Sequence, residues 1–220
     1  MTISATIRSA GWVLPRAGGL WDGRENRETN AGGADELFQD VVVGGREVKN
    51  YGRFPEGTRS VCSACALGLE GAGYGPEDKL PTAGILAAGF DRTLQQNEAF
   101  FRDYVENGRV MGRGNLFIYT LPTSSVAEAA ILFGIGGPCL YEEADGDPLP
   151  EMVASGCDFL NSGQAELMIL LWQDAEVTVC VVLETGEKSG IPVEQFAGST
   201  RELRSPRDVV EYFQGDGARR

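Results

Sequence analysis

The stretch from Asn115 to Gly163 constrains the fold of this chain more than any other part. It opens with NLFIYTLPTSSVAEAAILFGIGGP, where a Leu-Pro turn leads into a small-residue helical segment and then a Gly-rich corner. The run CLYEE follows, then the loop ADGDP and the helix-like segment LPEMVASGCDFLN. Two apolar runs, Leu167–Trp172 and Val177–Leu183, are joined by QDAE, which predicts an antiparallel hairpin. This order of elements predicts a mixed α/β sheet.

The rest of the chain continues the alternation of strand and helix signals. Residues Ile3–Leu14 alternate like a strand, and we expect the chain to pass close to another element at Gly11. The stretch 16–35, rich in Gly, Asn and Arg, is a predicted loop. The same signals predict a helix over 55–71, a buried strand over 83–89, an amphipathic helix closed by Gly108, an extended segment over 115–120 and a tail helix over 206–213 capped by Ser205.

The block LPTSSVAEAAILFGIGGP and the later SGQAE resemble the N-terminal half of β-ketoacyl synthases, members of the thiolase-fold superfamily. In that family a small-residue helix ends in a Phe-Gly-x-x-Gly-Pro corner. A strand then enters a Thr-Ala-Cys-Ala-Ser elbow, and the helix behind it ends near Ser-Gly-x-Ala-Asp. The family spacing fits between Pro138 and Ser162 without a gap and places the elbow on residues 144–148. The nucleophilic cysteine of the family aligns with Gly146.

The resemblance, strongest over Tyr51–Leu183, implies an α/β, thiolase-like half-fold with a mixed five-stranded sheet covered by helices. We expect a ketosynthase N-terminal-like domain over residues 1–184 and a tail with one short helix over 185–220. A complete thiolase fold stacks two similar halves, so this chain corresponds to one free-standing half. The helix behind the elbow would then have an uncovered side, which predicts an interface through Met152, Val153, Phe159 and Leu160.

Glycine at position 146 has no side chain that could act as the nucleophile of the family. Acyl transfer needs an activated thiolate or hydroxyl backed by a base and an oxyanion site. Ketosynthases take His, or His and Asn, from their C-terminal half, whereas this chain contains no histidine and ends at Arg220. We therefore predict no catalytic residue and no cofactor, and we interpret the chain as a pseudo-ketosynthase rather than an enzyme.

Five cysteines at irregular spacing do not make a disulfide framework, so reduced thiols are expected. Cys62 and Cys65 have C-x-x-C spacing, but they share a predicted helix face with apolar neighbours. This favours burial over metal or redox chemistry. No histidine exists to activate Cys139 or Cys157.

Acidic residues gather around the aligned elbow, namely Glu142, Glu143, Asp145, Asp147 and Glu151. Carboxylates can bind Ca²⁺ or Mg²⁺, but this loop lacks the spacing of a calcium motif, so we predict solvated side chains and no metal. In the family, the strand before the elbow is apolar and pairs across the dimer two-fold. Here it reads CLYEE, and its adjacent glutamates would repel their symmetry mates, which favours a different, basic partner.

The formal net charge is −13, and residues 114–187 contain twelve Asp and Glu but no Lys or Arg. Nucleic acid is therefore not an expected partner, since phosphate binding needs a concentrated basic surface. Direct contact with an acidic acyl carrier protein would be repulsive, so the surface either receives a basic protein or serves solubility. No apolar run approaches the roughly 18 residues of a membrane span. The N-terminus lacks a signal-peptide pattern, so we expect no membrane contact and a cytoplasmic location.

These features predict a non-catalytic ketosynthase-like partner subunit, akin in role to a chain-length factor, in fatty-acid or polyketide-type biosynthesis. We expect a homodimer or a heterodimer with a ketosynthase, and any contact with an acyl chain or acyl carrier would go through the partner. The resemblance places an acyl pocket near Met111, Phe117 and Tyr119. Two alternatives stay open: a free-standing acyl- or thioester-binding module, and an enzyme with rewired chemistry at Cys139 or the carboxylate cluster.

Overall fold

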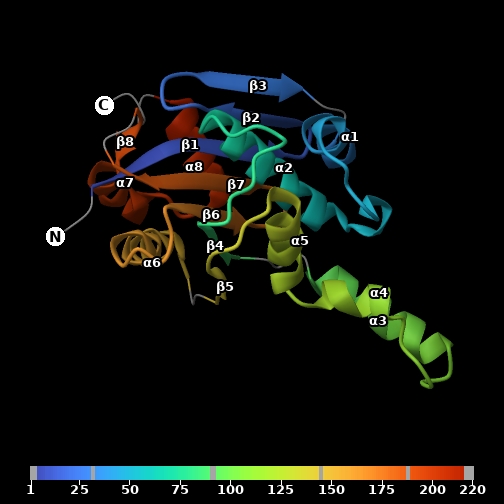
Figure 1. Cartoon of the computed structure of the whole chain (residues 1–220). Helices are drawn as coiled ribbons and strands as arrows, with labels where there is room; N and C mark the ends of the chain where they lie inside the picture. The colour runs from blue at the N-terminus through green and yellow to red at the C-terminus, as the bar shows by residue number, and fades with distance from the viewer. Residues whose placement is uncertain (1–3, 31–32, 90–92, 144–145, 187–188, 216–220) are drawn as a thin grey trace.

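The computed structural model describes residues 4–30, 33–89, 93–143, 146–186 and 189–215. They form one eight-stranded sheet in the order β3-β2-β1-β7-β6-β4-β5, with β8 paired to β1 beside this path (Figure 1). The strands are β1 (Ala5–Leu14), β2 (Ala17–Trp21), β3 (Asn26–Asn30), β4 (Ala83–Ala88), β5 (Cys139–Glu142), β6 (Leu167–Gln173), β7 (Thr178–Thr185) and β8 (Ile191–Pro192).

Helices cover both faces of this sheet (Figure 1). The α-helices are α1 (Ala34–Val41), α2 (Glu56–Gly71), α3 (Thr93–Glu106), α4 (Gly114–Phe117), α5 (Thr123–Phe133), α6 (Leu149–Asn161), α7 (Val193–Ser199) and α8 (Pro206–Gln214). Short 3₁₀ segments are η1 (Val43–Gly45), η2 (Tyr51–Arg53), η3 (Ile118–Thr120) and η4 (Thr200–Glu202).

The strand directions confirm the predicted mixed α/β sheet. β4 is parallel to both β5 and β6, whereas β6, β7, β1, β2 and β3 pair in antiparallel fashion in that sequence. The sheet has eight strands rather than five because the stretch 16–35, predicted as a loop, contains β2 and β3, and because the tail adds the short β8, which pairs with β1. The sequences of β2 and β3, AGGLW and NRETN, lack an apolar alternation, and pairing with β1 supplies their hydrogen bonds instead.

The central strands explain why two helical layers are needed. Every residue of β4 and β6 is buried, and so is every residue of β7 except its last. Along β7, Cys180 and Val182 join the core under α2 and α5, while Val179 and Val181 join the core under α6, α7 and α8. Successive side chains of a strand point to opposite faces, so a strand buried on both faces requires a cover on each.

Gly11 lies where β1 and α2 approach most closely, as predicted. A Cβ built on Gly11 would overlap the backbone of α2 at Ala64 and Gly68. A side chain at this position would push the helix off the sheet, so glycine fixes the contact between β1 and α2.

The C-terminal tail closes the second face of the sheet. Phe196 of α7 and Phe213 of α8 are buried with their rings 5.6 Å apart, and Phe213 also lies 5.2 Å from Trp21 of β2. The predicted tail helix is confirmed as α8, since Ser205 Oγ accepts a hydrogen bond from the Asp208 amide at 3.3 Å. α7 is an additional helix that the sequence pattern does not predict.

The tail overturns the expectation that α6 has an uncovered apolar side. Met152, Val153 and Leu160 are at most 3% exposed, and the half-buried Phe159 packs against the same core cluster. This cluster also contains apolar side chains of α7 and α8. The side chains predicted to lie in water are therefore covered within the chain itself.

One part of the chain projects away from the sheet. We call residues 93–121 the arm; it contains α3, α4 and η3, and its two α-helices extend beyond the body (Figure 1). No residue of α3 is buried. The segment predicted as extended over 115–120 is helical, and Phe117 packs against Phe100 of α3 with ring centroids 5.5 Å apart. Side-chain packing between α3 and α4 therefore accompanies the helical conformation of this segment.

The described helices were compared with the length and apolar composition that a membrane span requires. No single helix is both long and apolar enough to span a bilayer. One bent pair, 114–120 with 123–133, meets the length and composition criteria together, with an angle of 102° between its helices.

Replacing Phe213 by alanine tests the contribution of the tail to the core. We expect Phe213→Ala to lower the free energy of unfolding by about 3–5 kcal/mol, because it empties a buried aromatic site. The same change at Phe101 on the arm, where the side chain is 64% exposed, should alter it by less than about 0.5 kcal/mol. Urea unfolding of both variants provides the measurement, and equal effects would show that the tail is not part of the cooperative core.

Candidate functional site

The slot, residues 144–148, which the sequence predicts to correspond to the ketosynthase elbow, connects β5 to α6. Ala144 and Asp145 lie outside the described residues, whereas Gly146 is exposed with a φ of 131°. Apart from its two chain neighbours, no described residue has a heavy atom within 4 Å of the position that an added Cβ would take. A φ of this value disfavours any side chain with a Cβ, so a nucleophile here would be strained and would have no neighbours to position it.

Asp147, the next residue in the slot, has a structural use. Its Oδ1 accepts a hydrogen bond from the Leu149 amide at 3.1 Å, at the start of α6. Its Oδ2 lies 4.0 Å from Arg204 Nη1, which connects the slot to the segment before α8. A carboxylate at a helix N-terminus also interacts favourably with the helix dipole, so Asp147 stabilises the local fold.

The acidic residues around the slot do not assemble into an ion site in the part that the structure describes. Asp145 is outside that part, and Asp147 is engaged as above. Among the remaining described residues, no three His, Cys, Asp or Glu side chains are close enough to hold one metal ion. Glu143 and Glu151 are exposed and Glu142 is half-buried, so they contribute mainly negative surface charge.

The surroundings of the two thiols with access to solvent disfavour the thiolate form. Burial raises the pKa of Cys139, although a hydrogen bond from the Ile85 backbone opposes the shift. Burial also raises the pKa of Cys157, and the charges of Glu194 and Asp158 add to that shift. The thiolate is the reactive form of cysteine, so both environments reduce reactivity at neutral pH.

The remaining three thiols belong to the core. Cys62, Cys65 and Cys180 are fully buried, as expected for the C-x-x-C pair on one helix face. The pKa of Cys62 is raised by burial and then by Cys65 and Glu128. The pKa of Cys180 is raised by its hydrogen bond with Cys65 and then by burial. Cys65 of α2 and Cys180 of β7 therefore meet in the space between these two elements.

The structure separates the three residues predicted for an acyl pocket. Met111 is 81% exposed and Phe117 is 51% exposed, and both belong to the arm. Tyr119 is buried, donates a hydrogen bond to Glu128 Oε1 at 3.0 Å, and lines a cavity of about 380 Å³ beside Gln96 and other residues. Met111 and Phe117 are therefore exposed on the surface and Tyr119 alone of the three lines this cavity, so they do not share a pocket.

Exposed apolar side chains concentrate on the arm and continue onto neighbouring elements. The large ones with high exposure are Leu94, Phe101, Val105, Val110, Met111, Phe117, Ile118 and Leu121 on the arm, Ile131 on α5 and Leu140 on β5. β5 is the last strand of the sheet path, paired only with β4 among the described strands. An exposed apolar surface of this extent is typical of a protein interaction site.

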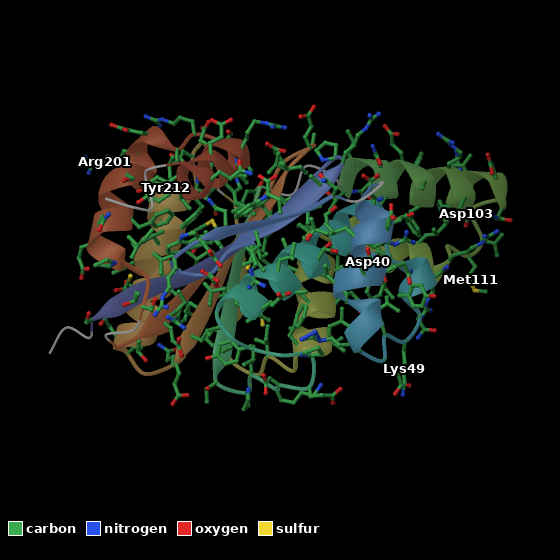
Figure 2. All side chains as sticks on the ribbon, turned by 90° about the horizontal axis from the view of Figure 1, so that it is seen from above. Asp40, Lys49, Asp103, Met111, Arg201 and Tyr212 are labelled. Carbon is green, nitrogen blue, oxygen red and sulfur yellow. The ribbon has the colours of Figure 1, made fainter. Side chains whose placement is uncertain are left out.

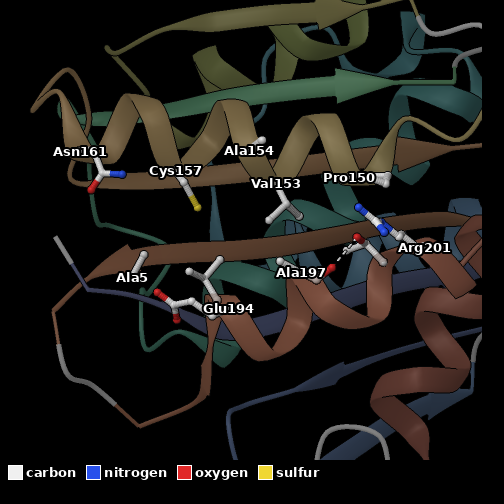
Figure 3. Close-up of a pocket in the computed structure, with 11 residues that line it drawn as sticks. Ala5, Pro150, Val153, Ala154, Cys157, Asn161, Glu194, Ala197 and Arg201 are labelled. Atoms are coloured by element: carbon white, nitrogen blue, oxygen red, sulfur yellow. Dashed lines mark hydrogen bonds between the residues drawn. The ribbon is translucent and has the colours of Figure 1, made fainter. Parts of the chain in front are cut away.

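A second surface lies at the other end of the molecule. Figure 2 shows Asp103 and Met111 of the arm at one end and Arg201 and Tyr212 of the tail at the other. There, a groove of about 350 Å³ separates α6 from α7 and η4 (Figure 3). Its lining includes Arg201 and Glu194, which the sequence did not single out. A local signal for them is absent because α7 was not predicted.

Neither any protein-family model nor any curated protein sequence matches this chain. Solved structures match it at the level of fold. The ishigamide ketosynthase/chain length factor is 11% identical with a TM-score of 0.57, covering 84% of this chain and 59% of that one. A type II polyketide synthase ketosynthase, solved with its acyl-carrier protein, is 10% identical with a TM-score of 0.55 and the same coverage.

A third structure is ketosynthase twelve of the bacillaene polyketide synthase from Bacillus amyloliquefaciens. It is 9% identical with a TM-score of 0.52, covering 91% of this chain and 42% of that one. The chain therefore has the thiolase-like fold of ketosynthases, and it spans 59% of the length of the first two structures. At these identities the likeness concerns the fold alone.

We expect the protein not to form an acyl adduct with acyl or malonyl thioesters, and Gly146→Cys to be acylated no faster than an ordinary exposed thiol. The introduced thiol would be strained by about 1–3 kcal/mol and would lack a positioned base, and catalytic groups act as a unit. Intact-protein mass spectrometry after incubation with the thioesters measures the adduct.

Gly163→Cys is the matched control, because Gly163 also has a positive φ and open space around its Cβ position. Both variants should react at the same slow rate as any exposed thiol. Faster acylation of Gly146→Cys than of Gly163→Cys would contradict the prediction, as would a stable adduct on Cys139 or Cys157 in the unmodified protein.

Proposed function

We propose that this protein is a non-catalytic, ketosynthase-like partner subunit, akin in role to a chain-length factor, in fatty-acid or polyketide-type biosynthesis. The observation that carries the proposal is Gly146, an exposed glycine with positive φ at the nucleophile position of a ketosynthase-like fold. The fold-level likeness to a ketosynthase/chain length factor supports the pathway class.

The thiol environments favour this role over an enzyme with rewired chemistry. Cys139 and Cys157 both have raised pKa values, and the sequence contains no histidine to act as their base. Asp147 is already engaged with Leu149 and Arg204. The described site therefore lacks an activated thiol and a free Asp147 for catalysis, whereas a binding role needs neither.

The arm is the surface that we assign to the partner. Burial of one exposed side chain such as Phe101 or Met111 is worth roughly 1.5–3 kcal/mol, and the arm carries several of them. Together they can offset much of the entropy lost on association.

Charge favours a ketosynthase with a basic face over a second copy of this chain. Residues 114–187, which begin within the arm and continue beyond it, contain twelve acidic and no basic side chains. Two such surfaces would repel one another, whereas a basic face would complement them. The ketosynthase would supply the nucleophile and contact the acyl carrier protein. We place this complex in the cytoplasm, because all five cysteines are free, including the exposed Cys139.

Capture of the tagged protein's partners from the native host tests the proposal. We expect a ketosynthase encoded near this gene to copurify and to be identified by mass spectrometry. Phe101→Asp with Met111→Asp should weaken its binding at least about tenfold, because charges would then enter an apolar contact. Gln195→Asp, an exposed change on α7, is the matched control and should leave binding unchanged. Capture that is insensitive to the arm variants would contradict the assigned surface.

Light scattering at several salt concentrations distinguishes the two kinds of dimer. Salt screens charge, so it should weaken a charge-matched heterodimer and strengthen a homodimer of like-charged chains. We expect the first behaviour with a ketosynthase present. A protein that stays monomeric with every candidate ketosynthase at high concentration would overturn the partner-subunit role.

A further inference from the structure

The groove between α6 and the tail is built by two helices that run in opposite directions. Figure 3 shows Pro150, at the start of α6, near Ala197 and Arg201, whereas Asn161, at the end of α6, lies toward Ala5 and Glu194. The groove encloses about 350 Å³, which is within the range of small-molecule sites. It is separate from the arm, which lies at the opposite end of the molecule (Figure 2).

The lining of this groove is apolar along its length and charged at its ends. Val153 and Val193 are buried beneath it, and the small, exposed side chains of Ala154 and Ala197 leave the space between the helices open. The charged residues of the lining are Arg201 at one end and Glu194 at the other. The chemistry therefore suits a ligand with an apolar body and one anionic head.

Arg201 is available for such a head. Its tail neighbours Arg204 and Arg207 lie within 4.0 Å and 3.4 Å of Asp147 and Glu176, whereas Arg201 forms no ion pair within the described ranges. A guanidinium presents paired donors that match the two oxygens of a carboxylate. At the far end Glu194 would repel a carboxylate, so the charges fix the direction of the ligand.

We propose that this groove binds an aliphatic carboxylate, with its head on Arg201 and its chain extending past Ala154 and Ala197 toward Cys157. The proposal is independent of the partner-subunit role, because the partner is assigned to the arm. It gives the tail a second use besides covering the sheet, since α7 and η4 supply both one wall of the site and its cation.

Cys157 provides a local reporter of occupancy. Its side chain faces the groove in Figure 3, and it is half-buried. In a Cys139→Ser background it is the remaining thiol with solvent access, since the other three cysteines are fully buried. We expect octanoate to slow the modification of Cys157 by N-ethylmaleimide. Octylamine, which has the opposite head charge, should not.

Two head-group variants test the predicted orientation. Arg201→Gln should raise the octanoate concentration needed for half-protection about tenfold or more, the loss expected for a charged hydrogen bond. Glu194→Gln removes the opposite charge at a matched position, and protection by octanoate should be unchanged or stronger. Equal octanoate protection in wild type and Arg201→Gln would overturn the proposed head site.

A filling variant tests the groove itself by calorimetry, which does not depend on access to Cys157. Ala154→Leu should abolish the heat of octanoate binding, because leucine fills the space and still suits a helix. Ala127→Leu, at an exposed alanine of α5 away from the groove, should leave the heat unchanged. Unchanged binding in Ala154→Leu would overturn the site. Protection of Cys157 that rises with protein concentration and without octanoate would show that a second copy covers the groove, and would overturn the ligand.

Discussion

The fold depends on three strands that are buried on both of their faces. β4, β6 and β7 carry apolar side chains toward each side, so both sides must be covered before the sheet is stable in water. α2 and α5 form one cover, with Gly11 allowing α2 to pack directly on β1. α6, α7 and α8 form the other. A half-length thiolase-like fold thus has both apolar faces covered by its own residues.

The need to cover both faces of the sheet also affects the residues just before α6. α6 begins immediately after the slot, and Asp147 connects its first turn to Arg204 of the tail. Gly146 is left on the surface with a positive φ and no neighbours for a side chain. In this protein α6 is a packing helix, and the described residues before it include the exposed Gly146 and the hydrogen-bonded Asp147.

Two surfaces outside the buried core, the arm and the groove beside α6, carry different kinds of side chain. The arm exposes large apolar side chains such as Phe101 and Met111, which suits a protein partner. The groove between α6 and α7 is narrow, lined by small apolar side chains and charged at its ends, which suits a small amphiphile. They lie at opposite ends of the molecule, so each can act without obstructing the other (Figure 2).

The sequence alone determined the strands with apolar periodicity, the β6–β7 hairpin, the cap of α8 at Ser205 and the glycine at position 146, because local spacing and residue type encode these features. Only the tertiary structure decided which faces are covered. β2 and β3 are polar or Gly-rich strands that depend on pairing with β1, and α7 is too short to leave a pattern. The burial of Met152 and the exposure of Met111 likewise depend on which distant segment packs beside each helix, and a helix's own residues do not specify that neighbour.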